Sequence, residues 1–586
     1  MYRARILSIS AMLLRLGAAT RGGVAVIGAL SLTTTIGMGA FAVEATQGYA
    51  AKVGNQRVAD MAALAGALAY NVSNSSSQMT ATAKAVAVAQ GLPANSAAVA
   101  LTTDSGTGQQ LVQVTVTTSV PLTLGRVLTS ALSYDVSAVG AATTTKTSTV
   151  TPPCIAAISN AATDGISMNG NTAIIATGCS VDTNDSIGMV GSASITAKQV
   201  DAGQSISRGG GASITTSPSA NNIFANKANA TSDWMQNDAG LKALLCSVNK
   251  LTGYSDGDYA DSNTACLSPL VAPSPAGASD WALNYSPNAT VAAYRTGNAT
   301  YVIPSGTYAI RNLTLAGGIT ATFQGPVNLT IGSITLGGGT TLHVGSGNIS
   351  VNGKIDLSGG AYADFAVGVG NSVTVGNDGA SPPVAISVGG GSTLCFTSAC
   401  AAPTAAGGTF SANGKITSNG GSTIIFPKAA THVINGNLDL SGSSTFGSGT
   451  YVIAGNFTNN TGGTMSGTDV SFALGGTFAL SGGTSLDLAA PGGSSSYGVP
   501  GVLFATKSSS ASSIGGGSSD KYAGLVYAPK SDLSISGGSS VSASGAACLM
   551  MIIRTITLSG SGSTSTGTCS ALPTTTGSTA NVALFR

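Results

Sequence analysis

The stretch that decides the fold is residues 327–357, which read VNLTIGSITLGGGTTLHVGSGNISVNGKIDL. Apolar and polar residues alternate there in short runs, and Gly, Ser or Asn separates one run from the next. Such alternation predicts β-strands with one buried face, and each strand here is only about three to five residues long. The turn signals of a β-sandwich usually come about every 8 to 12 residues. Strands this closely spaced instead favour a solenoid, in which each strand pairs with the equivalent strand of the next turn.

Internal echoes extend this pattern along the chain. Residues 352–359 read NGKIDLSG and residues 435–442 read NGNLDLSG. Asn-Gly pairs readily adopt the positive φ that tight corners need, which fits a solenoid but also a set of ordinary β-hairpins. The echoes favour the solenoid. We therefore predict a Gly/Ser/Thr-rich, parallel β-helix-like body over residues 154–586, in one part or two, with an irregular insertion at about 217–298.

The composition supports a folded, mainly β protein. Only 8% of the 586 residues are charged, against roughly a quarter in ordinary globular proteins, and 80 residues are Gly. Disordered chains combine few apolar residues with high net charge, whereas this chain is 43% apolar and has a net charge of +2. The 24 basic residues are thinly spread and nearly matched by 22 acidic ones, so we expect no nucleic-acid partner.

Residues 22–43, GGVAVIGALSLTTTIGMGAFAV, carry no charge. As a helix they cover the ~30 Å hydrocarbon thickness of a bilayer. A cleaved signal peptide is the alternative, but its apolar region is usually only about 7 to 15 residues long. The residues before the span include several arginines: Arg3, Arg5, Arg15 and Arg21. The positive-inside rule then predicts a cytoplasmic segment 1–21, a transmembrane helix 22–43 and a body across the membrane.

Two further parts are predicted between the span and the body. Apolar residues at three- and four-residue steps extend the anchor helix over residues 44–71. Residues 72–148 then form a small α+β module. Within that module we expect a helix at about 79–89, strands near 111–116 and 134–138, and a short helix at 122–132.

The anchor region is also recognisable as a sequence. From Arg21 to Ala67 it reads RGGVAVIGALSLTTTIGMGAFAVEATQGYAAKVGNQRVADMAALAGA, and it resembles the N-terminal segment of TadG-like proteins of bacterial Tad (Flp) pilus-assembly systems. The residues that carry the resemblance are Arg21, Gly22, Glu44, Tyr49, Lys52, Gln56 and Asp60. It implies a pilin-like helix and a single-pass protein of the bacterial inner membrane, with a cytoplasmic N-terminus and a periplasmic or cell-surface body. Its implied partners are other Tad pilus or envelope components.

Related Tad pseudopilins carry a Glu shortly after the Gly at which they are cleaved. Here the residues after Gly22 and Gly23 run Val24, Ala25, Val26, Ile27 and Gly28, without a Glu. The comparison with the pseudopilins therefore implies that the helix is retained as a permanent anchor.

The eight cysteines fall into sequence-local pairs on the far side of the span, where oxidation is permitted. The candidate disulfides are Cys154 with Cys179, Cys246 with Cys266, Cys395 with Cys400, and Cys548 with Cys569. Metal binding is the rival interpretation, but there is no Cys-x-x-Cys pair and the chain has only two His. We predict no metal and no cofactor.

Right-handed β-helices often house polysaccharide lyases or hydrolases, which need converging carboxylates. The body has no Glu, its Asp residues are scattered, and His343 and His432 lie beside apolar residues that would place both rings outward. Asp256, Asp258 and Asp261 superficially resemble a calcium loop, yet an EF-hand would need Glu where Leu267 stands, so a solvated loop is favoured.

These observations predict a structural, non-catalytic envelope protein in Tad/Flp pilus assembly or surface attachment. An adhesin whose Thr, Ser and Asn face binds surface glycans is the alternative, and a glycan-degrading enzyme is the third reading.

Overall fold

The computed structural model describes residues 22–73, 75–103, 110–127, 129–143, 153–160, 164–217, 222–227, 230–253, 266, 270–404, 406–544 and 548–567. The chain divides into two compact units, whose described parts are residues 22–143 and residues 153–567.

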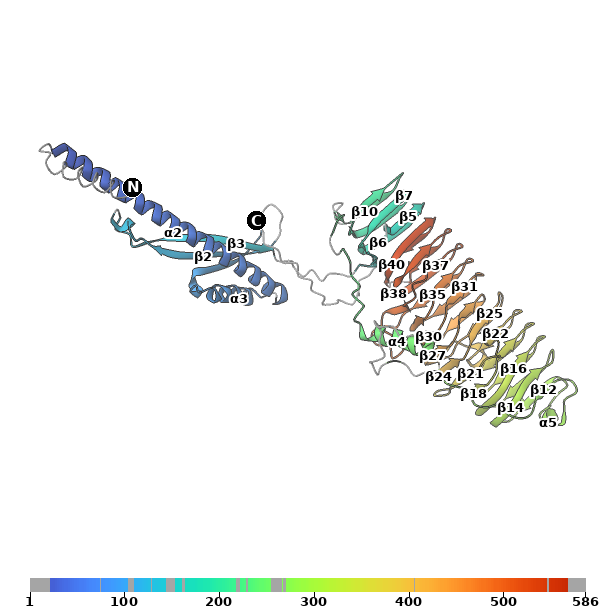
Figure 1. The fold of residues 1–586 in the computed structure, drawn as a ribbon. Coiled ribbons are helices and arrows are strands. Elements are labelled where there is room, and N and C mark those ends of the chain that lie inside the picture. The colour runs from blue at the N-terminus through green and yellow to red at the C-terminus, as the bar shows by residue number, and fades with distance from the viewer. Residues whose placement is uncertain are drawn as a thin grey trace, which may run out of the picture. The chain divides into compact units, whose positions relative to one another are not determined.

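The first unit is one long helix packed on a small sheet (Figure 1). Helix α2 (Gly22–Ser73) contains both the predicted span and its predicted extension without a break. Helix α3 (Ser76–Ala89) follows, and then an antiparallel sheet in the order β1-β2-β3. The strands are β1 (Ala97–Thr103), β2 (Gln110–Pro121) and β3 (Ser133–Thr143). Strand β1 was not predicted. Where a short helix was predicted at 122–132, the described residues contain only a 3-10 turn, η2 (Gly125–Val127).

Small side chains let α2 lie close to the sheet. Ala59, Ala62 and Ala63 are fully buried in the cluster that joins α2 to α3 and β2. Gly140 on β3 is required at this contact, because a Cβ there would lie 2.5 Å from the carbonyl carbon of Ala59. The second half of α2 is thus fixed by packing of backbone on backbone.

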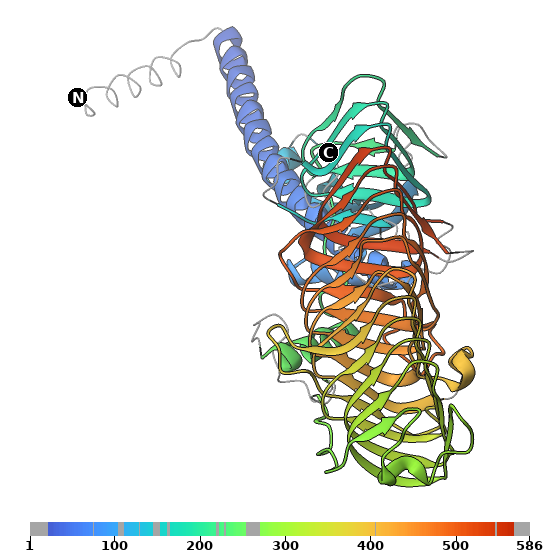
Figure 2. The same ribbon diagram turned by 90° about the vertical axis from the view of Figure 1, so that its right-hand side faces the viewer.

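The second unit is a parallel β-solenoid of about 18 turns, which confirms the predicted fold over a sandwich or a set of hairpins. Each turn passes through three faces. One turn illustrates the path: β15 lies on the first face, β16 bends across the second and third, and β17 starts the next turn on the first face. Figure 2 shows these turns stacked on one another.

The first face, which we call the hydroxyl face, is built from β13 (Thr300–Ile303), β15 (Thr320–Phe323), β17 (Thr341–Val344), β20 (Tyr362–Phe365), β23 (Thr393–Cys395), β26 (Thr423–Ile425), β29 (Ser443–Phe446), β32 (Thr464–Gly467), β35 (Ser485–Ala489), β39 (Ser540–Ala543), β41 (Ser563–Ser565), β10 (Ser213–Thr216) and the first parts of β38 (Ser519–Ile535), β6 (Ala173–Thr183) and β8 (Ser194–Ala202). The second, the covered face, is built from the first parts of β14 (Gly306–Leu315), β16 (Val327–Leu336) and β40 (Leu549–Gly560), with β18 (Gly347–Val351), β21 (Val373–Val375), β24 (Ala406–Ala412), β27 (Lys428–Ile434), β30 (Gly449–Ile453), β33 (Val470–Leu474), β36 (Val502–Thr506), the middle of β38, β4 (Ile155–Ala157), the ends of β6 and β8, and β11 (Ile223–Phe224). The third face is built from β12 (Trp281–Leu283), the ends of β14, β16, β38 and β40, β19 (Ile355–Leu357), β22 (Val384–Val388), β25 (Lys415–Ser418), β28 (Leu438–Leu440), β31 (Phe457–Asn459), β34 (Phe478–Leu480), β37 (Ser512–Ile514), β5 (Asp164–Gly170), β7 (Ser186–Gly191) and β9 (Ile206–Arg208).

The turns do not follow chain order. Strands β4–β11 form one end of the stack, after which the chain runs to the other end and resumes at β12. The last turns then meet the first ones, since Ile556 pairs with Ile166 and Ser563 pairs with Ala173. In Figure 1 the teal strands β5 and β6 accordingly lie beside the red strand β40. The predicted insertion at about 217–298 is the segment that makes this return, and it includes helices α4 (Ala239–Thr252) and α5 (Ala289–Ala292).

Glycines form the corner between the third face and the hydroxyl face. Gly359 and Gly390 both have positive φ, 63° and 60°. A Cβ on Gly390 would lie 2.6 Å from the nitrogen of Gly359 in the turn below, so the corners stack too closely for any other residue. The corner thereby fixes where each hydroxyl-face strand begins.

Aromatic rings fill much of the interior. Phe396 lies against Phe410 with ring centroids 5.1 Å apart, and Phe472 lies against both Tyr451 and Phe504 at 5.0 and 5.1 Å. These inward side chains form one continuous core along the solenoid.

Candidate functional site

The first half of α2 exposes large apolar side chains. Ile27 is 68% exposed and Phe41 is 74% exposed, and Leu30, Leu32 and Met38 are exposed between them. The described part of the chain contains one helix long and apolar enough to cross a membrane, over residues 25–70. A surface this apolar is stable in lipid and unfavourable in water. The first half of α2 is therefore the candidate membrane anchor.

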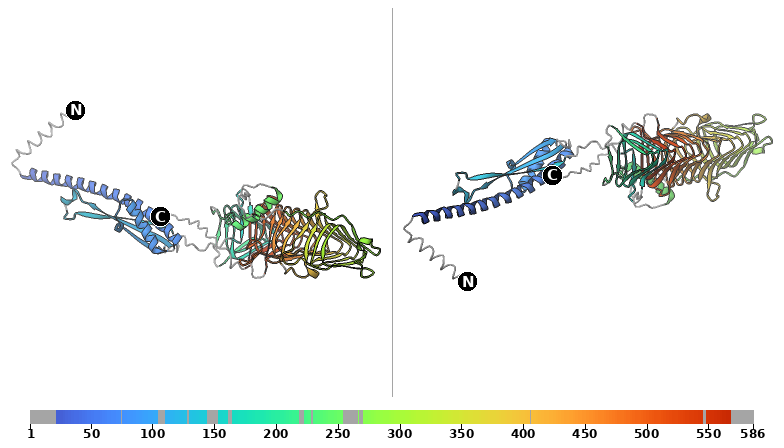
Figure 3. Two further views of the ribbon diagram at one scale, coloured as in Figure 1. Left: turned by 90° about the horizontal axis from the view of Figure 1, so that it is seen from below. Right: turned by 90° about the horizontal axis from the view of Figure 1, so that it is seen from above.

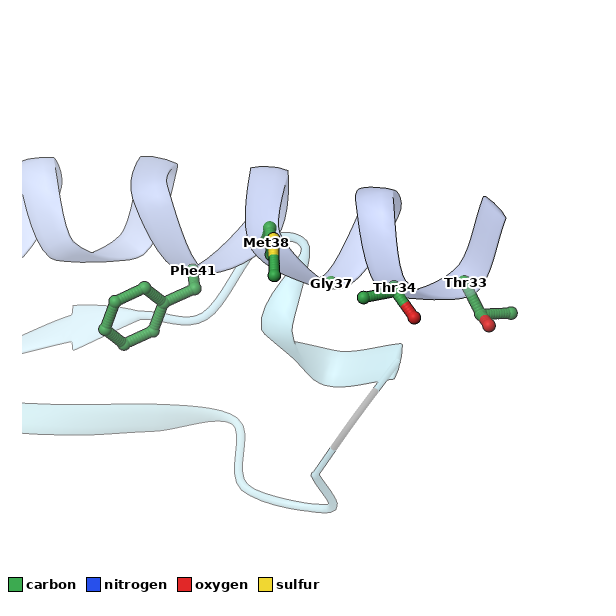
Figure 4. A pocket seen from close by; sticks show the side chains of 5 residues that line it. All are labelled: Thr33, Thr34, Gly37, Met38 and Phe41. Carbon is green, nitrogen blue, oxygen red and sulfur yellow. The ribbon is translucent and has the colours of Figure 1, made fainter. Parts of the chain in front are cut away.

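Threonines within this half do not leave polar groups open to the lipid. The Thr34 hydroxyl donates to the Leu30 carbonyl at 2.7 Å, and the Thr35 hydroxyl donates to the Ser31 carbonyl at 2.7 Å. Such bonds satisfy the hydroxyls inside the helix. Figure 4 shows Thr33, Thr34, Gly37, Met38 and Phe41, which line a shallow depression on this part of α2.

Glu44 marks the change from exposed to packed helix. Its buried carboxylate oxygen Oε1 accepts hydrogen bonds from the backbone N–H groups of Thr123, Leu124 and Gly125 at 2.6, 3.0 and 3.2 Å. The Tyr134 hydroxyl also donates to the Glu44 carbonyl oxygen, at 2.7 Å. The single Glu of the chain thus ties the loop between β2 and β3 to α2.

The other residues that carry the resemblance to TadG-like proteins include both residues that make contacts and residues that are exposed. The Gln56 amide donates to Asp60 Oδ1 at 2.8 Å and to the Val139 carbonyl at 2.9 Å, so these two residues help to join α2 to β3. Tyr49 and Lys52 are exposed on α2. Gly22 is the first residue of α2, and Arg21 lies outside the described residues.

Helix α4 covers one side of the solenoid, as Figure 3 shows beside the orange strands. The Asp238 carboxylate caps its start by accepting from the Leu241 N–H at 2.8 Å, and Gly253 ends it with a φ of 69°. The buried side chains of α4 pack in a cluster with outward-facing residues of the covered face: Ala156, Val452, Ala473, Ala505, Leu525, Tyr527 and Ile552. This helix was not predicted, because the region was expected only as an irregular insertion at about 217–298.

Three of the predicted cysteine pairs are disulfides: Cys154–Cys179, Cys246–Cys266 and Cys395–Cys400. Cys548 is also disulfide-bonded, and its predicted partner Cys569 lies outside the described residues. Cys246 is on α4, so the bond joins Cys266 to this helix.

The two histidines have different environments, and the prediction of two outward rings was wrong for His432. The half-exposed His343 ring lies 2.8 Å from Asp364 Oδ1. His432 is fully buried, and its Nε2 lies 2.8 Å from the Pro427 carbonyl oxygen. The prediction assumed that the apolar Val433 points into the core, which would place His432 outward. Val433 instead faces outward on the covered face, where apolar side chains are also buried.

Two carboxylates that are distant in sequence meet across adjacent turns. Asp182 on β6 pairs in register with Asp201 on β8, and Lys227 forms an ion pair with Asp201. Asp182 is 6% exposed and Asp201 is 2% exposed. Burial, with the Asp201 carboxylate as a second cause, raises the pKa of Asp182 well above its usual value. This pair was not predicted, because the two residues are brought together only by the stacking of turns.

Asp256, Asp258 and Asp261 lie outside the described residues. Within the described ranges, no group of three or more His, Cys, Asp or Glu side chains is placed to hold a metal ion. Comparisons of the chain with protein-family models, curated proteins and solved structures find no match.

Proposed function

We propose that the protein is a membrane-anchored, non-catalytic component of the bacterial envelope that resembles TadG and acts in Tad/Flp pilus assembly or surface attachment. The observation that carries this proposal is the division of α2. Its first half exposes large apolar side chains, whereas its second half packs on α3 and the β1-β2-β3 sheet. A helix built in this way has one part suited to lipid and one part suited to a folded domain.

The distribution of charge and cysteine supports a single-pass topology. Four arginines precede the apolar residues, and the disulfides all follow them. Arginines favour the cytoplasmic side and disulfides persist on the oxidising side. The proposal therefore places the N-terminus in the cytoplasm, the anchor in the inner membrane and the solenoid in the periplasm or at the cell surface.

Burial of one carboxylate pair and of one histidine supports a non-catalytic role. Asp182 and Asp201 are adjacent, but both are buried, and Asp201 is paired with Lys227. His432 is equally enclosed. A general acid or base must come within hydrogen-bonding reach of its substrate, which these groups do not.

Fractionation of the native bacterium tests the anchor and its orientation. We expect the full-length protein to stay with the inner membrane after alkaline carbonate extraction. We also expect protease added outside spheroplasts to digest the solenoid, whereas a cytoplasmic protein in the same spheroplasts stays intact. Release by carbonate would contradict the anchor. Mass spectrometry of the mature N-terminus checks retention, since a start at Gly23 or Val24 would show pilin-like cleavage.

The pilus role has its own test. Deletion of the gene should abolish or shorten surface pili seen by electron microscopy, and the full-length chain should restore them. Normal pili in the deletion strain would restrict the proposal to surface attachment. Direct attachment to glycans is favoured as a second role by the outer surface of the hydroxyl face, described next.

A further inference from the structure

The hydroxyl face carries two outward columns that run along the solenoid. The first is mostly Ser and Thr, and the second, which begins at Val302, is about half Ser and Thr. Alternate residues of each strand point outward while the residues between them enter the core, as in Ser443-Ser444-Thr445 and Thr464-Met465-Ser466. Register places equivalent residues of successive turns side by side. The first column contains Thr300, Thr320, Thr341, Tyr362, Thr393, Thr423, Ser443, Thr464, Ser485, Ser519, Ser540, Ser563, Ala173, Ser194 and Ser213, and the second contains Val302, Thr322, His343, Asp364, Cys395, Ile425, Thr445, Ser466, Asp487, Lys521, Ser542, Ser565, Ile175, Thr196 and Thr215.

The columns form a regular grid. Adjacent strands lie about 4.8 Å apart and alternate residues of one strand lie about 6.7 Å apart, which fixes the spacing of the hydroxyls in both directions. Thr464 and Ser443, on adjacent turns, have their hydroxyl oxygens 3.1 Å apart and hydrogen-bonded. The strands β29 and β32 that bear these residues continue without a gap from β26. The surface is therefore a flat, repeating array of hydroxyls instead of a pocket.

The array differs from the covered face in what lies over it. Helix α4 covers apolar outward residues on β30, β33 and β36. On the hydroxyl face, the turn Ser398–Cys400 packs against β20 and β23, and the Ala399 N–H donates to Asp364 Oδ2 at 2.7 Å. Beyond that turn, the outward residues from Thr423 to Ser466 are uncharged and at least partly exposed.

We infer that this stretch of the hydroxyl face binds an extended, uncharged polysaccharide that lies along the solenoid axis. Each sugar hydroxyl is both a donor and an acceptor, and so is each Ser or Thr hydroxyl, so successive sugars can pair with successive turns. The partner is a polymer because the array repeats by simple translation and has no concavity to enclose one sugar. The partner is uncharged because none of the outward residues of β26, β29 and β32 is ionisable: these are Thr423, Ile425, Ser443, Thr445, Thr464 and Ser466.

The strength of binding should come from repetition. A single exchange of water for a sugar hydroxyl contributes little, whereas contacts on several turns of one rigid solenoid act together. A polysaccharide that spans the three strands β26, β29 and β32 should therefore bind at least tenfold more tightly than a monosaccharide, which reaches one or two strands only. This inference deepens the attachment role proposed above and rests on it.

A triple variant tests the inference. In the full-length protein in detergent, Thr445→Val, Thr464→Val and Ser466→Ala remove three outward hydroxyls while keeping side-chain shape. The matched control Thr335→Val, Thr417→Val and Ser513→Ala makes the same changes on the third face, at positions that point outward there. Retention on insoluble cellulose and chitin, both neutral, is compared with retention on anionic alginate, and melting temperatures check folding.

We expect wild type and control to be retained by at least one neutral polymer, and the triple variant to lose at least tenfold in affinity with an unchanged melting temperature. Equal retention of the triple variant would overturn the inference, as would binding to alginate alone, binding to monosaccharides as tight as to the polymers, or thermal hysteresis in ice with no retention on any polymer. Carbonate extraction of the triple variant distinguishes failure of this inference from failure of the proposed function. Anchoring does not depend on the hydroxyl face, so a protein that stays in the membrane but does not bind polysaccharide contradicts the inference alone.

Discussion

His432 and Asp520 are titratable groups inside the solenoid core whose pKa values are shifted in opposite senses. The His432 ring stacks on Tyr451 with centroids 3.9 Å apart, and burial lowers the pKa of His432 to about 4. Asp520 accepts weak hydrogen bonds at 3.3 Å from the Thr484 hydroxyl and the Leu486 N–H, and burial raises its pKa to about 6. The fold favours the neutral form of each group. Between about pH 4 and 6, rising pH therefore increases the stability contribution of His432 and decreases that of Asp520.

Replacing Asp520 by Asn should stabilise the protein at neutral pH. The folded pKa of about 6 lies above the unfolded value of 3.8, so the contribution of Asp520 is most favourable below about pH 4 and is lost as pH rises through about 6. The loss amounts to about 3 kcal/mol at most. We expect Asp520→Asn to raise the melting temperature at pH 7.5 and to remove this part of the pH dependence. An unchanged pH profile would show that Asp520 is already ionised at no cost.

Replacing His432 by Phe should have the opposite pH signature. Its folded pKa of about 4 lies below the unfolded value of 6.5, so its contribution is fully present above about pH 6.5 and is lost as pH falls through about 4. Thermal unfolding of His432→Phe between pH 7 and 4 should therefore show a shallower loss of stability than wild type. Thr335→Val, at an exposed position without a titratable group, is the control and should leave the acid limb unchanged. A steeper acid limb in His432→Phe would contradict the assignment.

At the scale of elements, α4 stabilises the covered face by burying apolar residues outside the core. Leu245 is fully buried in this contact. We expect Leu245→Ala to cost about 2 to 5 kcal/mol of the free energy of unfolding, because it removes packing and leaves a cavity. Urea unfolding measures this change, and limited proteolysis should cut first near residues 230–253. The exposed hydrogen bond of Lys242 to Asn237 makes Lys242→Ala the control, with a change below about 0.5 kcal/mol. Equal effects of the two substitutions would mean that α4 is not held by its apolar side.

The sequence predicts the solenoid better than it predicts what covers it. Alternation in residues 327–357 identifies one buried face for each strand, and the structure has those strands in register. The same alternation fails at Val452, which faces outward yet is buried, because α4 supplies a second apolar environment. The helix itself has a local signal, with Asp238 before it, Gly253 after it and leucines at helical spacing, that was overlooked among the Gly-rich repeats.

The hydroxyl columns also have a signal in the sequence. Gly-Gly followed by Ser or Thr recurs where a hydroxyl-face strand begins, as at Gly339-Thr340-Thr341 and Gly391-Ser392-Thr393, and register then aligns the outward hydroxyls. The pairing of β40 with β5, in contrast, has no local signal. It joins residues that are nearly the whole solenoid apart in sequence, and only the finished stack brings them together.

At the scale of the whole molecule, the disulfides should differ in importance. Cys154–Cys179 spans 25 residues in sequence and lies where the first turns meet the last, whereas Cys395–Cys400 spans 5. Loop closure predicts about 3 kcal/mol for the longer loop and less for the shorter. We expect the double variant Cys154→Ser with Cys179→Ser to lower the melting temperature more than Cys395→Ser with Cys400→Ser. The reverse order would show that the short bridge stabilises the folded turn instead of restricting the unfolded chain.

The return of β40 and β41 to the first turns has a consequence for secretion. If the N-terminal anchor inserts first, strands β4–β11 emerge from the translocon early, yet the strands they must stack on, β40 and β41, emerge last. In the topology proposed above, both pieces would until then present unpaired sheet edges in the compartment that receives the solenoid. A ribosome stalled before Leu549 would release a chain whose two pieces cannot be joined. Such open edges would distinguish an unfinished chain from a finished one, and a protease or chaperone could recognise the unfinished chain by them.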